Sequence, residues 1–589
     1  MARRHHHTSG DWTSVAARLD EIVAASCGEH AFDALFQLVL GRLVAELDGD
    51  DAPLADLLAR AQARWPSIEA GVVPLLDPAT AVRCRAVLDG ASLLESGLMG
   101  LDALFEGLNS RQSKGAKGQF FTPRHVVHQA LAMLDPQPGE SLCDPACGSG
   151  AFLVHACLQQ PDARVVGVDL DPRAARTARV MLAALGRDPD AVQRADSLGS
   201  AEGEGTFDVV ATNPPFAGDV ADRYDGSFAL AAGRRVERDV LFLERSLRLL
   251  KPGGRLAIVL PQNKLGAKRW AFVRRWLLCR MEPLAVVGLG RSTFLPHTSQ
   301  KACLFVGRRR PEALAEPPPD ERVLLFVSRR AGKDGAGRLL LRDTAADAPL
   351  WQAVDHDLAE ATALLRAPAT HPSATRRSLS ELDAGFVLAP ERYDPRRVLA
   401  STSSTRIGDV VEASRALYRP AEATRPVLVL DTTHALQGFV RLGHAPVAPT
   451  EVGSSKRQLQ PGDLIVSRLR PYLQQIALVD AALFGRDPVG NDVACSTEFY
   501  VLRARGGSAA WLLPWLLGEA VQAALAAAQE GGHHPRVRLE ALLDLPVPAR
   551  LMAQREAVAA AVQAQVEGAR AAGEGLAALA KQDWRRGGP

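Results

Sequence analysis

The residues with the clearest chemical potential lie in the segment ATNPPFAG, residues 211–218. Proline lacks a backbone N–H and clashes with a preceding helical turn, so Pro214 and Pro215 exclude a helix interior and disfavour a central strand. The run FDVVAT just before them is apolar and predicts a buried strand. Asn213 then follows the carboxyl end of that strand. Its side-chain oxygen and the carbonyl of Pro214 offer two hydrogen-bond acceptors on a stiff backbone.

Such a pair of acceptors suits a planar amino group. Two acceptors can hold both hydrogens of an –NH2 on an aromatic ring and draw its lone pair out of conjugation, which makes the nitrogen a usable nucleophile. The ring of Phe216 can stack on a flat base. A proline-rich turn would explain Pro214 and Pro215, but not Asn213 and Phe216. We therefore predict that residues 213–216 hold a reacting amine.

A second group of residues is typical of a ligand-binding loop. The segment DPACGSG, residues 144–150, stands between a predicted strand and a predicted helix. Its small residues allow a close backbone approach, and a helix N-terminus favours a carboxylate or another polar group. The next strand ends in Asp169, whose carboxylate can accept both ribose hydroxyls. Asp196 follows one helix later and could either bind an exocyclic amine or cap a turn. The glycine spacing differs from G-x-G-x-x-G, which disfavours a dinucleotide.

The surrounding elements explain how these residues could meet. Strands and helices alternate over residues 139–306, which predicts a parallel, doubly wound α/β sheet. Ligands bind such sheets at the carboxyl ends of the strands. Before the sheet, a Gly- and Lys-rich loop at 114–118 leads into FFTP. We expect a helix to begin near Pro123, with Thr122 as its N-cap.

Composition limits the remaining classes of function. A net charge of +2 gives no global basic field, although one basic face remains compatible with nucleic acid. The eight cysteines form no CxxC pair, so we predict no metal site and buried thiols in a reducing compartment. No apolar run reaches the ~18 residues of a membrane span. The N-terminal MARRHHHTSG lacks the apolar segment of a secretion signal. We expect a cytoplasmic protein with no membrane partner.

In their order along the chain, these motifs resemble the N6-adenine DNA methyltransferases, and most closely the modification subunit of type I restriction–modification systems. The matching segments are GQFFTPRHVV, DPACGSGAFLV, VVGVDLDP, NPPF and LKPGGRLAIVLP, within about residues 90–310. The resemblance implies a Rossmann-like α/β core that uses S-adenosyl-L-methionine. The implied catalytic residues are Asn213, Pro214, Pro215 and Phe216. The implied cofactor-binding residues are Gln119, Phe120, Phe121, Thr122, Pro123, Arg124, Asp144, Ala146, Gly148, Ser149, Gly150, Asp169 and Asp196.

The same resemblance implies direct displacement on double-stranded DNA. An adenine flips out of the duplex, and its N6 attacks the sulfonium methyl group. No general base is evident. Two other interpretations stay open. Residues 213–216, the predicted amine clamp, could hold cytosine N4 or a glutamine amide instead. Alternatively, the chain could be a catalytically idle subunit that only recognises DNA. No nuclease or translocase motif is present, so cleavage in a restriction or phage-defence system would need a partner.

The C-terminal third resembles one half of a type I specificity subunit. The matching segments are ELDAGFVLAPERYDP, RIGDVVE, QPGDLIVSRLRP, STEFYVLRA and LPVPARLMAQREAVAAAV. Basic residues near GDLIVS could contact DNA, although each taken alone suits a solvated surface: Lys456, Arg457, Arg468 and Arg470. One recognition half per chain implies either a homodimer or assembly with restriction and specificity subunits. In the homodimer, a long helix over 551–584 would pair with its copy. That helix could instead brace its own domain.

These observations predict five segments. They are an N-terminal helical domain (1–110), a methyltransferase domain (111–330), a linker or extension (331–400), an α+β target-recognition domain (401–549) and a long C-terminal helix (550–589).

Overall fold

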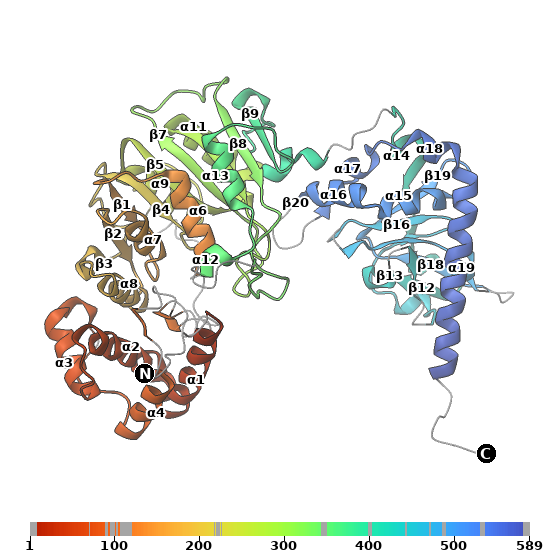
Figure 1. Ribbon diagram of the computed structural model, residues 1–589. Coiled ribbons are helices and arrows are strands. Elements are labelled where there is room, and N and C mark those ends of the chain that lie inside the picture. The colour runs from red at the N-terminus through yellow and green to blue at the C-terminus, as the bar shows by residue number, and fades with distance from the viewer. Residues whose placement is uncertain are drawn as a thin grey trace, which may run out of the picture. The chain divides into compact units, whose positions relative to one another are not determined.

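The structure is a computed structural model of the 589-residue chain. It describes residues 9–69, 71–88, 92–94, 100–101, 104–105, 121–216, 218, 224, 226–342, 350–397, 403–436, 438–441, 445–469, 473–485, 490–530 and 536–580. The chain divides into two compact units, Met1–Pro390 and Glu391–Pro589 (Figure 1).

The first unit begins with helices, within the segment predicted to be helical. They are α1 (Ser9–Cys27), α2 (Ala31–Asp48), α3 (Leu54–Arg64) and α4 (Pro78–Leu88). Helix α2 is the centre of this group, and Phe36 packs between Phe32 and Phe105. Helix α2 also contacts α8 (Pro172–Ala184). The guanidinium of Arg176 on α8 lies 4.9 Å from the ring centroid of Phe36 and forms an ion pair with Asp33, both on α2.

A nine-stranded sheet follows, in the order β3-β2-β1-β4-β5-β7-β6-β8-β9. Its strands are β1 (Ser141–Asp144), β2 (Arg164–Asp169), β3 (Val192–Arg194), β4 (Phe207–Thr212), β5 (Leu250–Pro261), β6 (Met281–Gly288), β7 (Ala302–Arg309), β8 (Arg322–Val327) and β9 (Ala374–Ser378). Strands β1 to β5 are mutually parallel. The predicted parallel arrangement does not extend to the whole sheet, because β7 runs antiparallel to β5 and β6, and β9 to β8. The connection from β6 to β7 contains no crossover helix, which a parallel pair requires.

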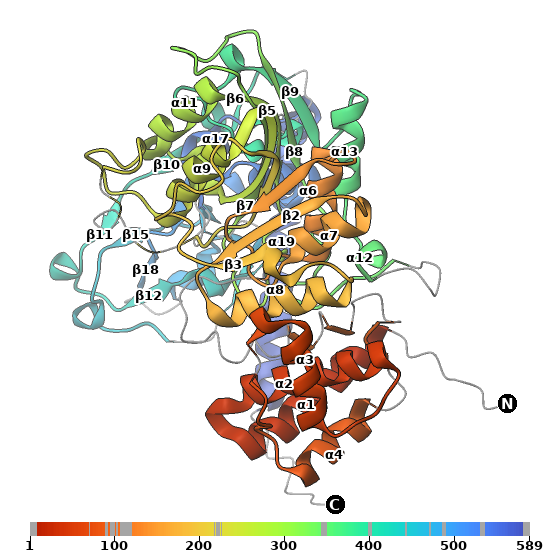
Figure 2. The ribbon, with the colours of Figure 1, turned by 90° about the vertical axis from the view of Figure 1, so that its left-hand side faces the viewer.

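Helices cover both faces of the sheet (Figure 2). Helices α6 (Arg124–Leu134), α7 (Ala151–Gln159) and α13 (Leu358–Arg366) pack together on one face, whereas α9 (Arg238–Leu249) and α11 (Ala271–Arg280) cover the other. The hydroxyl of Thr362 on α13 donates to the side chain of Gln129 on α6 at 2.8 Å. The segment predicted as an extension, 331–400, therefore contributes α13 and β9 to this unit.

The second unit contains two four-stranded sheets. One has the order β10-β19-β16-β17, with strands at Val411–Ser414, Phe499–Ala504, Leu464–Ser467 and Ile476–Leu478. The other has the order β11-β15-β18-β12, with strands at Leu417–Tyr418, Lys456–Gln458, Asp492–Cys495 and Val427–Leu430. This unit is β-rich, and its strands lie within the segment predicted to be α+β.

The helices of the second unit are more broken than predicted. The helical stretch over residues 509–527 bends by 79° between Ala509–Leu517 and Glu519–Ala527, at Gly518. The expected helix over 551–584 is interrupted at Gln554, between α18 (Ala549–Ala553) and α19 (Arg555–Ala580). Val562 and Val566 of α19 are buried in the core of its own unit, which is the bracing arrangement. Among the described residues, no single helix has the length and apolarity of a bilayer span, although the bent pair passes that test jointly.

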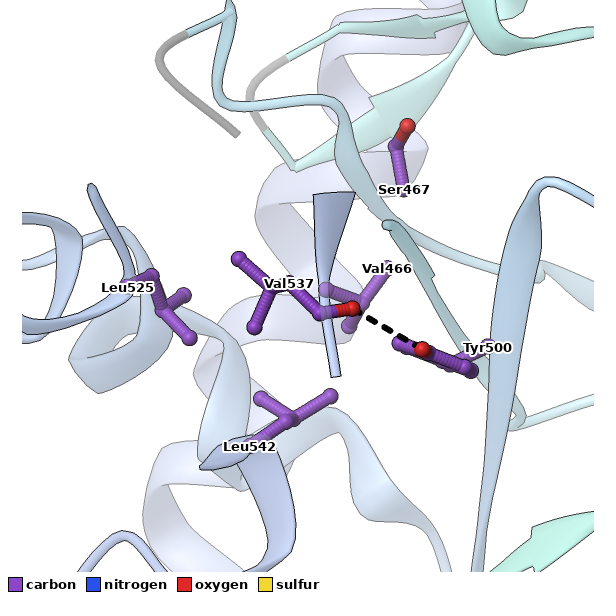
Figure 3. A pocket seen from close by; sticks show the side chains of 6 residues that line it. All are labelled: Val466, Ser467, Tyr500, Leu525, Val537 and Leu542. Atoms are coloured by element: carbon purple, nitrogen blue, oxygen red, sulfur yellow. Dashed lines mark hydrogen bonds between the residues drawn. The ribbon is translucent and has the colours of Figure 1, made fainter. Parts of the chain in front are cut away.

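A small cavity lies in this second core (Figure 3). It is lined by Val466, Ser467, Tyr500, Leu525, Val537 and Leu542. The hydroxyl of Tyr500 donates to the carbonyl of Val537 at 2.9 Å across it. The cavity has room for about one water molecule, so it is a packing defect rather than a ligand site.

Candidate active site

The predicted site residues follow neighbouring strands at one edge of the sheet. Asp144 ends β1, Asp169 ends β2, and Asn213 follows β4. These strands are parallel neighbours, so their carboxyl ends lie together. The chain order reverses between β1 and β4, which is where doubly wound sheets bind ligands.

The loop after β1 is shaped by its glycines. Gly148 and Gly150 have φ of +55° and +84°, a conformation that L side chains rarely adopt. A side chain at Gly150 would also come within 3.0 Å of the Cβ of Ala178. The N–H of Ala146 donates to Oδ1 of Asp144 at 3.0 Å, which fixes the start of the loop. Ala146, Gly148 and Ser149 remain half-buried and accessible in front of α7.

Asp169 is tied to the same loop. Its Oδ2 accepts the N–H of Gly148 at 2.9 Å, and its Oδ1 accepts the N–H of Asp171 at 2.8 Å. Burial raises the pKa of Asp169, and it raises the pKa of Asp144 to about 7. Two acidic groups that resist ionisation in one place form an environment that favours a positively charged ligand.

Asn213 presents the acceptor that the sequence predicts. Its Nδ2 donates to Oγ1 of Thr122 at 3.0 Å, which fixes the orientation of the amide. Its Oδ1 is buried and has no hydrogen-bond partner among the residues that the structure describes. A buried acceptor without a donor costs about 1–3 kcal/mol, so this oxygen is well placed to accept a hydrogen bond from a ligand.

Thr122 therefore has a different role from the predicted helix cap. Helix α6 begins at Arg124 with Pro123 as its N-cap, and no side chain caps it. The Thr122 hydroxyl is instead engaged with Asn213. Phe121 lies half-buried just before it, whereas Gln119 and Phe120 fall outside the described residues.

The ring of Phe216 is covered. Its exposed fraction is 3%, and Phe294 packs edge-on against it with 6.3 Å between ring centroids. Base stacking by Phe216 stays a prediction, and it requires the side chains that cover this ring to move. Sequence reasoning missed Phe294, because only the β6–β7 connection brings it to this edge.

Asp196 lies beside Asp169, since the N–H of Ala195 donates to the carbonyl of Asp169 at 3.0 Å. Its carboxylate accepts the N–H of Leu198 at 3.2 Å and the hydroxyl of Tyr224 at 2.6 Å. Tyr224 is buried and was not singled out from the sequence, where nothing marks an isolated tyrosine in a loop.

In the second unit, Arg468 is ion-paired with Glu498 at 3.0 Å, and Arg536 pairs with the same carboxylate. Hydrogen bonds from Arg536 and Arg468, opposed by burial, lower the pKa of Glu498 to about 2. The fourth predicted basic residue, Arg470, lies outside the described residues.

Comparison with known proteins finds relatives of part of this chain. Residues 104–338 match the N-6 DNA Methylase family model. The chain is 30% identical over 246 residues to the type I restriction enzyme EcoEI methylase subunit of Escherichia coli, covering 38% of this chain and 49% of that protein. It is 30% identical over 190 residues to the EcoKI methylase subunit of Escherichia coli K12, covering 28% and 35%. The chain thus spans half or less of the length of these relatives.

The fold also resembles a solved structure, the type IIG restriction endonuclease BpuSI. The TM-score is 0.51 at 14% identity, with 93% of this chain and 75% of that chain covered. At this identity the likeness concerns the fold alone. The N-6 DNA Methylase match, over residues 104–338, includes the strands, loops and helices that assemble the site.

Proposed function

We propose that this chain is a site-specific DNA adenine-N6 methyltransferase of a restriction–modification or related phage-defence system. The observation that carries the proposal is the buried Oδ1 of Asn213, which Thr122 orients and which has no donor among the described residues. An exocyclic amino group supplies that donor. The N-6 DNA methylase match over residues 104–338 supports adenine as its source.

The residues at the strand ends fit S-adenosyl-L-methionine. The Gly148–Gly150 turn gives close backbone access, and the acidic surroundings of Asp144 and Asp169 suit a cation. We assign Asp169 to the ribose hydroxyls and Asp196 to the purine amino group. The cofactor, when bound, supplies a methyl group on a sulfonium, which carries its own activation.

The protein's contribution to the reaction is then chiefly positioning. Oδ1 of Asn213 and the carbonyl of Pro214 accept the two amino hydrogens, which frees the nitrogen lone pair for attack. Pro215 keeps this backbone rigid. Flipping the base costs a few kcal/mol, which stacking on Phe216 offsets once its ring is uncovered.

A basic surface beside the site supports a polyanionic substrate. The backbone N–H of Arg238 donates to the carbonyl of Gly218 at 3.2 Å, so the start of α9 adjoins the Asn213 loop. Ring contacts join this region to the start of α11, with Arg234 4.8 Å from the Phe272 centroid and Arg269 4.7 Å from that of Trp270. The exposed cations of this basic surface are Arg234, Arg235, Lys268 and Arg269. Phosphates are the groups that such cations contact.

We further propose that the second unit is a target-recognition domain resembling half of a type I specificity subunit. Its two small sheets and long helix are compatible with that assignment. The chain would act in the cytoplasm on double-stranded DNA, as a homodimer or with restriction and specificity subunits.

Modification-sensitive sequencing of DNA from a methylation-free bacterial host tests the function. The host expresses either the wild-type chain or the Asn213→Ala variant. We expect a new N6-methyladenine motif with the wild type alone, and a split motif with mirrored halves if the chain dimerises. Detection of N4-methylcytosine instead would show that cytosine, not adenine, is the acceptor. No mark, with or without the neighbouring genes, would contradict the enzyme and favour an idle recognition subunit.

A further inference from the structure

The hydroxyl of the buried residue Tyr224 lies at the carboxylate that we assign to the purine amino group. It donates to Oδ2 of Asp196 at 2.6 Å, while the N–H of Leu198 donates to Oδ1 at 3.2 Å. Two donors on different oxygens fix both the position and the rotation of a carboxylate. Each oxygen of a carboxylate can accept more than one hydrogen bond.

Tyr224 is held in place by the segment that follows it. Its ring packs edge-on against Phe228, with 6.3 Å between centroids. The N–H groups of Ala229 and Leu230 donate to the buried carboxylate of Glu244 at 2.9 and 2.8 Å. The guanidinium of Arg248 donates to the carbonyl of Ser227 at 2.7 Å and lies 4.8 Å from the Phe228 centroid. Two side chains of helix α9, Glu244 and Arg248, therefore hold the segment against which the Tyr224 ring packs.

The position of Tyr224 in the chain adds a second relation. It follows the Asn213 loop, whereas Asp196 follows β3 on the other side of β1. The hydrogen bond thus joins the segment downstream of the predicted amine clamp to the predicted cofactor pocket. A tyrosine with only a packing role needs no hydroxyl aimed at this carboxylate.

We propose that Tyr224 is a positioning residue that orients Asp196 to accept the 6-amino group of the cofactor's purine, and so sets the preference for adenosyl over inosyl cofactors. The inference rests on the proposed use of S-adenosyl-L-methionine. An inosyl purine carries a 6-oxo group, which presents an oxygen to the carboxylate instead of a donor. A carboxylate fixed by Tyr224 discriminates between the two, and a carboxylate free to rotate discriminates less.

The test measures dissociation constants of S-adenosylhomocysteine and S-inosylhomocysteine by calorimetry on the full chain. We expect the wild type to prefer the adenosyl ligand by at least about tenfold, the size of a hydrogen bond to a charged acceptor. Tyr224→Phe, which keeps the ring, should lower that ratio by about fivefold with little change in affinity for the inosyl ligand. Asp196→Asn should also lower the ratio. In the Asp196→Asn background, Tyr224→Phe should have no further effect, because it acts through the carboxylate.

A matched control is Tyr500→Phe in the second unit, which removes a hydroxyl bonded at 2.9 Å to a carbonyl. It should leave both ligand affinities unchanged. The inference is overturned if Tyr224→Phe weakens both ligands in parallel, as a purely structural defect would, or if the ratio stays at the wild-type value. A wild-type chain that binds neither ligand would overturn the proposed function as well, so the two failures are distinguishable.

Discussion

Replacement of Asp144 by Asn should stabilise the cofactor-free protein by more at pH 8 than at pH 5. Asp144 is 1% exposed, and burial raises its pKa from 3.8 to about 7. Because the folded state binds the proton more tightly than the unfolded state, the stabilising effect is present at low pH and disappears as the pH rises through the folded pKa. The loss is about 1.4 kcal/mol per pH unit over this window.

Between pH 5 and pH 8 the wild type should lose about 3 kcal/mol of unfolding free energy from this one group. The Asp144→Asn variant has no such group to ionise, and its Oδ1 can still accept the N–H of Ala146. Its stability relative to the wild type should therefore rise by about 3 kcal/mol across that range. Guanidinium unfolding at both pH values measures this, in the transition that added S-adenosyl-L-methionine shifts.

A stability difference between the two proteins that is the same at pH 5 and pH 8 would refute the argument, because it would mean that Asp144 ionises normally in the folded state. We also expect the variant to bind S-adenosyl-L-methionine at least about tenfold more weakly, since the site loses an anion that attracts the sulfonium. Greater stability with weaker binding is the usual trade-off at a functional site.

Three further predictions follow from the geometry. Although burial raises the pKa of Asp208, hydrogen bonds from Lys251 and Ser141 lower it to about 2, so Asp208→Asn should cost about 1–2 kcal/mol at pH 7. That cost should shrink as the pH falls from 4 towards 2 in urea unfolding, the opposite sign to Asp144. Thr122→Val should lower kcat about tenfold with little change in cofactor affinity, because it removes the hydrogen bond that holds the Asn213 side chain. Thr122→Ser keeps the hydroxyl and should restore the rate. A Thr122→Val rate equal to that of the wild type would show that the hydrogen bond is dispensable. Lys268→Ala should reduce the slope of log DNA affinity against log salt by about one, and a slope equal to that of the wild type would remove Lys268 from the DNA interface.

Local signals account for what the sequence predicts well. The apolar run before Asn213 and the prolines after it depend only on adjacent residues, and β4 ends at Thr212 as they indicate. The glycines after Asp144 likewise predict a tight loop, and Gly148 and Gly150 do adopt the positive φ that glycine favours.

The misses involve partners that are distant in sequence or that compete locally. Phe294 and Tyr224 reach the site only through strand order and loop packing, which a single sequence does not reveal. The hydroxyl of Thr122 suits a helix cap by its local pattern, but bonding to Asn213 prevails in the fold. The antiparallel direction of β7 depends on how a helix-free connection closes. These are tertiary choices rather than errors of propensity.

The contact between α2 and α8 bears on how this protein should be trimmed for expression. Helix α8 begins three residues after Asp169, and Arg176 on it is engaged by Asp33 and Phe36, while Arg179 donates to the carbonyls of Val192 and Ser67. A fragment that starts at the predicted boundary near residue 110 would remove the residues that cover this helix, next to Asp169. The minimal catalytic fragment should therefore keep the helices from Ser9 onward, even though none of them carries a reacting group.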